Sequence, residues 1–299
     1  MDRTAAGSFA TGRVMMAMLE ALGCRGPDSA GVAVLRARVP GGDGWTLRLA
    51  PMDVAGEAFA TLNALGVVEA VDRQADSLRF VLRPRPGLTA AGLEKALKER
   101  RGGLEVLCCG TQLDLVKQVG SPSQLEASYA VSEWHGRVAI GHTRMSTESR
   151  IDLSHSQPFW AHGLLDVASV HNGHVTNYHQ LRRRYEQEGV TFYTDNDSEV
   201  IGVYLRDRLN GGLSLPEALE SSIADLDGAF SYLVISPEGL GVVRDRFGFK
   251  PLMVAETDEF VAVATEEIAL RRALPGDYDV CEPPPGRATF YPLAAPVMV

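Results

Sequence analysis

The chain has 299 residues, of which 45% are hydrophobic and 22% charged, so it can bury a substantial core and lacks the composition of a disordered protein. Its 29 basic and 38 acidic residues leave a formal net charge of −9, which argues against a dedicated binder of nucleic acid or anionic membranes, since these need a basic face. No segment approaches the ~18–20 uninterrupted apolar residues of a membrane span, and the first residues lack the basic and apolar regions of a signal peptide. We therefore expect a cytoplasmic protein with neither a membrane nor a nucleic-acid partner.

The cysteines do not predict a metal site. They are Cys24, Cys108, Cys109 and Cys281, and their spacing does not match that of zinc ligands. Four thiols in a chain of this length are compatible with a reducing compartment. Cys108 and Cys109 lie within the apolar run LEVLCCG, so we expect both to be buried and unreactive.

The N-terminal part begins with an apolar helix over residues 12–23, followed by the turn RGPDS (25–29) and a strand over 31–39. The next section has its own order of elements, β-α-β-β-α-β. The expected elements are strand 45–50, helix 54–65, strands 67–71 and 77–83, helix 89–101 capped by Thr89, and strand 104–109. This order is that of a ferredoxin-like unit. We predict a single domain, 1–299, with an inserted α+β subdomain within 45–125 that packs outside the main sheets.

The pattern changes after residue 136. Apolar strands over 137–144 and 164–173 each end in polar residues, and three amphipathic helices and four short strands follow. The helices are expected over 176–189, 197–210 and 215–226, and the strands over 229–236, 240–245, 251–256 and 260–266. Because short turns separate these four strands, we expect hairpins in one antiparallel sheet. Helices that flank a sheet rather than alternate with its strands indicate an α+β fold.

Four polar clusters lie where these elements meet turns, which is where functional sites are commonly carried. They are 25–29 (RGPDS), 142–147 (HTRMST), 171–173 (HNG) and 195–199 (DNDSE). Each cluster alone has an ordinary structural explanation, such as a helix stop, a turn or an N-cap. Their occurrence together and in this order is much less expected by chance.

These clusters belong to a longer series of motifs, through which the chain resembles the class II glutamine amidotransferase domain, an N-terminal-nucleophile hydrolase. The motifs are 25–31 (RGPDSAG), 141–147 (GHTRMST), 156–159 (SQPF), 170–173 (VHNG), 194–200 (TDNDSEV), 227–230 (DGAF) and 244–252 (RDRFGFKPL). The resemblance covers about residues 12–38 and 136–272. The inserted section and the ending near 282–291 look most like the amidotransferase-like subunit of N-methylglutamate synthase and related glutamate-synthase-like systems.

The resemblance implies a four-layer αββα sandwich that carries the ferredoxin-like insert. It also implies a subunit that hydrolyses L-glutamine to glutamate and passes the ammonia to a separate synthase subunit. No P-loop and no GxGxxG motif after a strand offers an acceptor site in this chain. No cofactor is implied, because amide hydrolysis through a thiol needs none.

The resemblance also assigns site residues, and the charge chemistry agrees. Arg144 matches the arginine that pairs with the substrate α-carboxylate, which a guanidinium binds bidentately, and Thr147 could add a hydroxyl bond. Asp197 matches the acidic residue for the α-ammonium. Asn172 and Gly173 would form the oxyanion hole with a side-chain and a backbone N–H. Arg25 resembles the arginine that steadies the nucleophile end of the site. A surface salt bridge for Arg144 and a helix cap for Asp197 are the structural alternatives.

The family's nucleophile does not appear at the start of this sequence. In the family it is a cysteine at the mature N-terminus, whose own α-amine is the general base, and it opens a strand upstream of the RGPDS turn. Here the sequence starts MDRTAAG, and Cys24 lies beside Arg25 at a helix end without a free amine, so we interpret it as a bystander thiol. Expressed from Met1, the protein is therefore expected to show no glutaminase turnover.

Two interpretations of this start remain. In the one we favour, the given start is internal and a short cysteine-led strand precedes it, because loss of a central strand would leave backbone groups unpaired. In the other, the protein is a catalytically inactive glutamine-binding or regulatory subunit of such a complex. An unrelated N-terminal hydrolase acting on penicillin or bile-salt amides is a weaker rival, because it would lack the pair Arg144 and Asp197.

Overall fold

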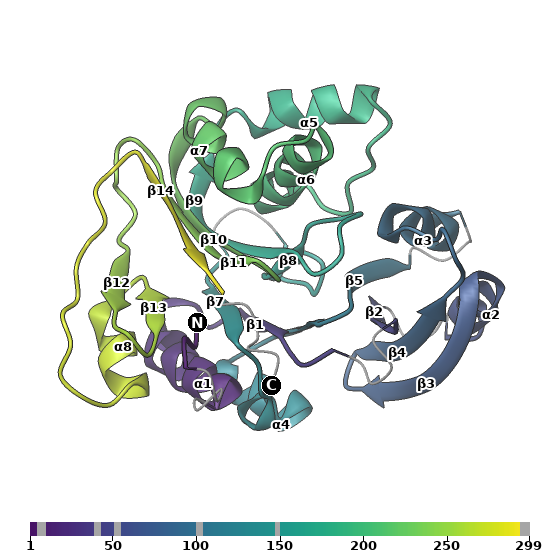
Figure 1. The fold of residues 1–299 in the computed structure, drawn as a ribbon, viewed down its shortest axis with the longest axis horizontal. Helices are drawn as coiled ribbons and strands as arrows, with labels where there is room; N and C mark the ends of the chain where they lie inside the picture. The colour runs from purple at the N-terminus through teal and green to yellow at the C-terminus, as the bar shows by residue number, and fades with distance from the viewer. Residues whose placement is uncertain (5–9, 39–42, 51–54, 100–103, 147–149, 294–299) are drawn as a thin grey trace.

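The computed structural model describes residues 1–4, 10–38, 43–50, 55–99, 104–146 and 150–293. Figure 1 shows two β-sheet layers stacked face to face, with one set of helices above them and another below. A smaller unit of strands and helices lies to one side. The α+β class and the four-layer αββα arrangement predicted from the sequence are thereby confirmed.

One sheet has three antiparallel strands in the order β6-β1-β7. Its strands are β1 (Ser29–Leu35), β6 (Leu113–Val119) and β7 (Val138–Arg144), and the helices packed on it are α1 (Thr11–Leu22) and α4 (Pro122–Tyr129). β1 is buried along its whole length, because Val32 and Val34 pack toward the helices whereas Ala33 packs toward the opposite sheet. Burial on both faces explains why this segment is a continuous apolar run.

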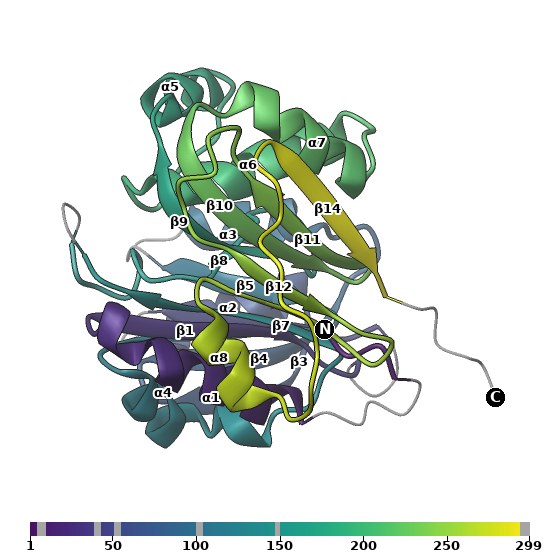
Figure 2. The same cartoon turned by 90° about the vertical axis from the view of Figure 1, so that its left-hand side faces the viewer.

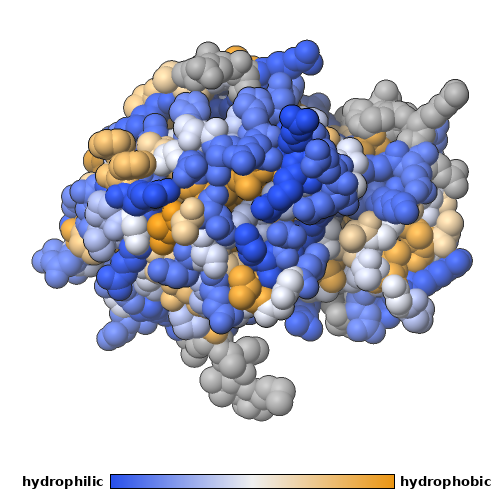
Figure 3. Space-filling model, turned by 90° about the horizontal axis from the view of Figure 1, so that it is seen from above, coloured by the Kyte–Doolittle hydropathy of each residue, from blue (hydrophilic) through white to orange (hydrophobic). Residues whose placement is uncertain are grey.

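The second sheet has the antiparallel order β14-β11-β10-β9-β8. Its strands are β8 (Phe159–Trp160), β9 (Ala168–Val175), β10 (Gly228–Ser236), β11 (Gly239–Arg244) and β14 (Arg287–Pro292), and its helices are α5 (Tyr178–Gln187), α6 (Asp197–Asn210) and α7 (Leu215–Asp225). α6 is buried from Ser198 to Leu205, since it lies between β9 and the other two helices. Figure 3 views the molecule from this helical side and shows mainly hydrophilic side chains, as expected for helices that face solvent.

The four strands that were expected to form one sheet divide between two layers, which corrects the prediction. β10 and β11 pair in the second sheet, whereas β12 (Met253–Glu256) and β13 (Val261–Ala264) form a separate hairpin. Residues 245–252 carry the chain from one layer to the other, and the hairpin then packs on α1 and on α8 (Glu267–Ala273) through Ala262 and Ala264. Figure 2 shows β12, α8 and α1 on the same side of the molecule.

The inserted unit has the predicted β-α-β-β-α-β order and forms a four-stranded antiparallel sheet, β3-β4-β2-β5. Its elements are β2 (Trp45–Ala50), α2 (Ala55–Leu65), β3 (Gly66–Gln74), β4 (Ser77–Pro84), α3 (Ala90–Lys98) and β5 (Glu105–Gly110). Within the described residues, none of its strands pairs with residues 229–266. The inserted sheet ends at Gly110, as the last strand expected over 104–109 predicted, and the next strand of the 45–125 section, β6, pairs with β1 in the main sandwich.

The insert is joined closely to the sandwich rather than simply placed outside it. Its apolar core and the core between the two main sheets form one continuous cluster of buried side chains. A buried ion pair also links β2 to β6, since Arg48 Nε donates to Asp114 Oδ1 at 2.7 Å. Among the helices of the described chain, none has the length and apolarity needed to cross a membrane.

Candidate functional site

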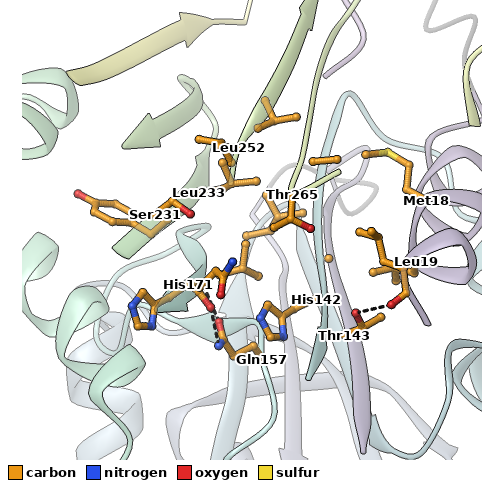
Figure 4. A pocket seen from close by; sticks show the side chains of 18 of the residues that line it. Met18, Leu19, His142, Thr143, Gln157, His171, Ser231, Leu233, Leu252 and Thr265 are labelled. Atoms are coloured by element: carbon orange, nitrogen blue, oxygen red, sulfur yellow. Dashed lines mark hydrogen bonds between the residues drawn. The ribbon is translucent and has the colours of Figure 1, made fainter. Parts of the chain in front are cut away.

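A cavity of about 460 Å³ lies between the layers and is lined by α1, β7, β9, β10, β13 and the first turn of α6. Figure 4 shows His142, Gln157 and His171 in the lower part of the view, the apolar side chains of Met18 and Leu19 at the right, and those of Leu233 and Leu252 above. Its volume falls in the range of about 300–1,000 Å³ that is typical of small-molecule sites. An amphipathic lining of this kind suits a small ligand with charged ends.

Arg144 ends β7 and places a buried guanidinium at this cavity. Its Nη1 donates to the carbonyl of Arg150 at 3.0 Å. Burial lowers the pKa of Arg144, and the negative charges of Asp152, Asp28 and Asp197 oppose that shift. The RGPDS turn supports this strand end, because Asp28 N donates to the Arg144 carbonyl at 3.0 Å and Asp28 Oδ2 accepts from Ser146 N at 2.8 Å.

Asp197 is the first residue of α6 and lies on the cavity wall. The preceding residue, Asn196, is the N-cap, and its side chain accepts from Ser198 N at 3.0 Å. Asp197 Oδ2 accepts from Val175 N at 2.9 Å, which ties the helix to the end of β9. Asp197 Oδ1 lies 3.8 Å from His171 Nδ1. Burial lowers the pKa of His171 and the Asp197 charge partly offsets this effect, so a neutral imidazole adjoins this carboxylate.

Asn172 and Gly173 lie on β9 and also line the cavity. Gly173 has a φ of +121°, and a Cβ placed there would be only 2.1 Å from the carbonyl oxygen of Ala229. The position therefore requires glycine. Lys250 packs over the same residue, with its Cε 3.0 Å from that hypothetical Cβ.

The structure thus brings Arg144, Asn172, Gly173 and Asp197 around one cavity. Arg25 also lines it, but its guanidinium pairs with Glu266 at a half-exposed position. Thr147 lies outside the described residues. None of the four cysteines, all within described parts of the chain, lines the cavity: Cys24 and Cys281 are exposed, whereas Cys108 and Cys109 are buried as predicted. Burial raises the pKa of the Cys108 thiol to about 12, which keeps it unreactive.

Several lining residues were not singled out from the sequence. Burial lowers the pKa of His142 to about 4, with smaller contributions from the adjacent His171 ring and from the charge of Arg144, so His142 is neutral at physiological pH. Two buried ring nitrogens, His142 Nδ1 and His171 Nε2, have no hydrogen-bond partner among the described residues. All four residues of this kind belong to motifs that the sequence already offered, since His142 lies in GHTRMST, His171 in VHNG, Gln157 in SQPF and Lys250 in RDRFGFKPL, but none of the four was assigned a role there.

The cavity extends between β7 and β13. Within the described chain, β7 has a ladder partner only on its β1 side and β13 only on its β12 side, so their facing edges are open. The first residues occupy one end of this space: Asp2 N donates to the Arg137 carbonyl at 2.7 Å, and Val261 N donates to the Met1 carbonyl at 2.9 Å.

We call the remaining space, lined by residues 139–144 and 261–265, the strand slot. Asp2 pairs antiparallel with Phe260. The slot therefore continues from Met1 toward Arg144 and Thr265, where the polar lining residues lie. Its two open strand edges offer the hydrogen-bonding groups that an extended segment would use.

Comparison with known proteins gives consistent matches. A family model described as a glutamine amidotransferase domain matches residues 142–272. A protein of Methanothermobacter thermautotrophicus, provisionally named a glutamine amidotransferase, is 35% identical to this chain over 291 residues. The aligned region is 94% of this chain and 94% of that protein. The glutamine amidotransferase-like protein GlxB of Rhizobium meliloti is 34% identical over 260 residues, which is 87% of this chain and 85% of that protein.

Solved structures show the same fold. Glutamine phosphoribosylpyrophosphate amidotransferase from B. subtilis matches with a TM-score of 0.61 at 18% sequence identity. The match covers 93% of this chain and 44% of that one, so the chain spans less than half of the solved enzyme.

Proposed function

The chain belongs to the glutamine amidotransferase family, and on this basis we propose that the cavity binds L-glutamine for hydrolysis to glutamate and ammonia. The observation that carries the proposal is the convergence of Arg144, Asn172, Gly173 and Asp197 on one cavity. These groups complement glutamine at three points. Arg144 pairs with the α-carboxylate, Asp197 with the α-ammonium, and Asn172 and Gly173 face the side-chain amide. In this proposal Thr147 adds a hydroxyl bond and Arg25 supports the nucleophile end.

The strand slot suggests where the nucleophile belongs. An extended segment antiparallel to β13 would complete the β7 and β13 edges and would present its N-terminal residue beside Arg144 and Thr265. We propose that a cysteine at that end attacks the glutamine amide carbon. The tetrahedral intermediate then breaks its C–N bond and releases ammonia, and water hydrolyses the thioester to glutamate.

We further propose that the ammonia passes to a separate synthase subunit in the cytoplasm, in a glutamate-synthase-like or N-methylglutamate-synthase-like complex. The alternative is a non-catalytic glutamine-binding subunit. It is favoured by one observation, that no cysteine of the described chain lines the cavity.

Glutamine binding tests the first proposal directly. Calorimetry should detect binding of L-glutamine to the purified chain, and Arg144→Lys and Asp197→Asn should each weaken it by about ten- to a hundredfold, the cost of a hydrogen bond to a charged group. Arg246→Lys is the matched control, because Arg246 forms an exposed pair with Asp227. Unchanged affinity in both site variants would exclude this cavity as the glutamine site.

Hydrolysis tests the role of the slot. The chain from Met1 should release no glutamate, whereas the same chain preceded by a cysteine-led strand should do so, and replacing that cysteine by alanine should abolish release. Glutamate release from the Met1 form that is lost in Cys24→Ser would instead assign the chemistry to Cys24. Glutamine binding without turnover in every form would support the non-catalytic alternative.

A further inference from the structure

Lys250 lies at the cavity without an ionic partner. The chain has four lysines, all in parts that the structure describes. Lys250 is half-buried and lines the cavity, and it makes no hydrogen bond or ion pair with the described residues. Each of the other three pairs with a carboxylate, in the pairs Lys95–Glu99, Lys98–Glu94 and Lys117–Glu105. The positive charge of Lys250 is therefore available to a ligand.

The loop that carries Lys250 is bound to the strand that faces the proposed oxyanion hole. Asp245 is buried at the start of this loop; its N–H donates to the Phe230 carbonyl at 3.0 Å, and its Oδ2 accepts from Phe230 N at 3.0 Å. Its Oδ1 also accepts from Gly248 N at 3.2 Å. Phe230 pairs with Gly173 in the ladder between β9 and β10. These contacts explain why Lys250 Cε lies over Gly173, 3.0 Å from its hypothetical Cβ.

The ammonium of Lys250 adds positive charge to the end of the cavity that contains Gly173. This charge acts on the neighbouring ring, because burial lowers the pKa of His171 and Lys250 adds a shift in the same direction. The acidic residues among the described lining residues are Asp2 and Asp197, and neither pairs with Lys250. A negative charge on a ligand at this end would therefore meet a cation that no carboxylate already neutralises.

Glutamine and glutamate share their α groups and differ only at the end of the side chain. In the proposed function Arg144 and Asp197 take the α groups. The side chain then extends toward Asn172 and Gly173. We propose that Lys250 pairs with the side-chain carboxylate of a ligand, so that the cavity binds L-glutamate as well as L-glutamine. The inference rests on the proposed function, from which it takes the orientation of the ligand, and it adds a residue that holds the product of hydrolysis.

Calorimetry with L-glutamate and L-glutamine at about pH 7.5 tests this pairing, because the glutamate side chain is ionised at that pH and the glutamine amide is neutral. Lys250→Met should weaken glutamate binding by roughly five- to twentyfold, the effect of one partly screened charge pair near a protein surface. Glutamine binding should change by less than about twofold, because methionine keeps an unbranched apolar chain over Gly173 and removes only the charge.

Two variants serve as controls. Lys250→Arg keeps the positive charge and should bind glutamate within about threefold of the natural chain. Lys95→Met removes an exposed lysine that pairs with Glu99 and does not line the cavity, and it should alter neither affinity. If Lys250→Met folds poorly, Lys250→Gln removes the same charge and should give the same difference between the ligands. Added salt should weaken glutamate binding to the natural chain more than glutamine binding.

The two ligands separate this inference from the proposed function. If Lys250→Met weakens both ligands equally or changes neither, Lys250 does not pair with the side-chain carboxylate, and the proposed function stands. Binding of glutamine without any binding of glutamate to the natural chain leads to the same conclusion. Absence of binding of both ligands would overturn the proposed function and this inference with it.

Discussion

Gly173 adopts a backbone conformation that residues with a Cβ rarely take, with φ at +121° and the Ala229 carbonyl 2.1 Å from a hypothetical Cβ. Two costs therefore add on substitution by alanine: the conformational strain, about 1–2 kcal/mol, and the displacement of β10. The position is also next to Asn172 in the proposed oxyanion hole. Geometry and proposed chemistry thus favour glycine here for separate reasons.

We expect Gly173→Ala to lower the free energy of unfolding by more than about 2 kcal/mol and to weaken glutamine binding. Gly212→Ala is the matched control, because Gly212 also has a positive φ, +95°, but no atom lies within 4 Å of its hypothetical Cβ. Urea denaturation of both variants measures the difference. Equal losses in the two variants would show that only backbone strain matters at Gly173.

At the scale of elements, Gln157 compensates for a short strand. β8 has two residues and pairs with Ser169 and Ala168 of β9. Next to β8, the Gln157 side chain makes the hydrogen bonds to β9 that a strand backbone would otherwise make. Its Nε2 donates to the His171 carbonyl at 2.9 Å, and its Oε1 accepts from His171 N at 2.6 Å. Both bonds are buried and hold the part of β9 that carries Asn172.

Gln157→Leu should therefore lower the free energy of unfolding by about 2–4 kcal/mol, because it leaves two buried backbone groups unpaired. Gln180→Leu, at an exposed position on α5, should change stability by less than about 0.5 kcal/mol. Chemical denaturation compares the two. A loss in Gln157→Leu no larger than in the control would show that water or a neighbouring group replaces these bonds.

At the scale of the whole molecule, a buried ionic contact joins the insert to the sandwich. Glu94 on α3 lies 3.1 Å from His162 Nδ1 and 3.1 Å from Lys98 Nζ. Burial alone would raise the pKa of Glu94, but the hydrogen bond and charge of His162, with a contribution from Lys98, lower it to about 2. The folded state therefore binds a proton at Glu94 less readily than the unfolded chain does.

The lowered pKa of Glu94 determines how the free energy of unfolding changes in acid. Because the folded pKa lies below the ordinary value of 4.5, the contribution of Glu94 to stability is present above pH 4.5 and is lost as the pH falls toward 2. Its full size is about 3 kcal/mol at most. Glu94→Gln should reduce the slope of unfolding free energy against pH in this window, whereas Glu99→Gln, at an exposed position one turn further on, should leave it unchanged. Identical slopes in the two variants would contradict the shift.

Much of this architecture was predictable from local sequence. The start of α6 at Asp197, the apolar run of β1, and the element order of the insert depend on neighbouring residues, so periodicity and capping were sufficient to predict them. The motifs also predicted the four residues that meet at the cavity. They did so through their resemblance to a known family, since each polar cluster alone, at a strand end or a helix start, also had an ordinary structural explanation.

The remaining features of the fold and the site depend on which segments, far apart in the sequence, pack against one another. The division of β12 and β13 from β10 and β11, the pairing of β6 with β1, and the contribution of α4, α8 and β14 are fixed by packing between layers, which no local pattern encodes. The same holds for Lys250 over Gly173, and for the strand slot between β7 and β13. Hydrogen bonds and burial between residues far apart in sequence arise only when the layers close, and the pKa shifts of buried groups such as His142 and Glu94 follow from that closure.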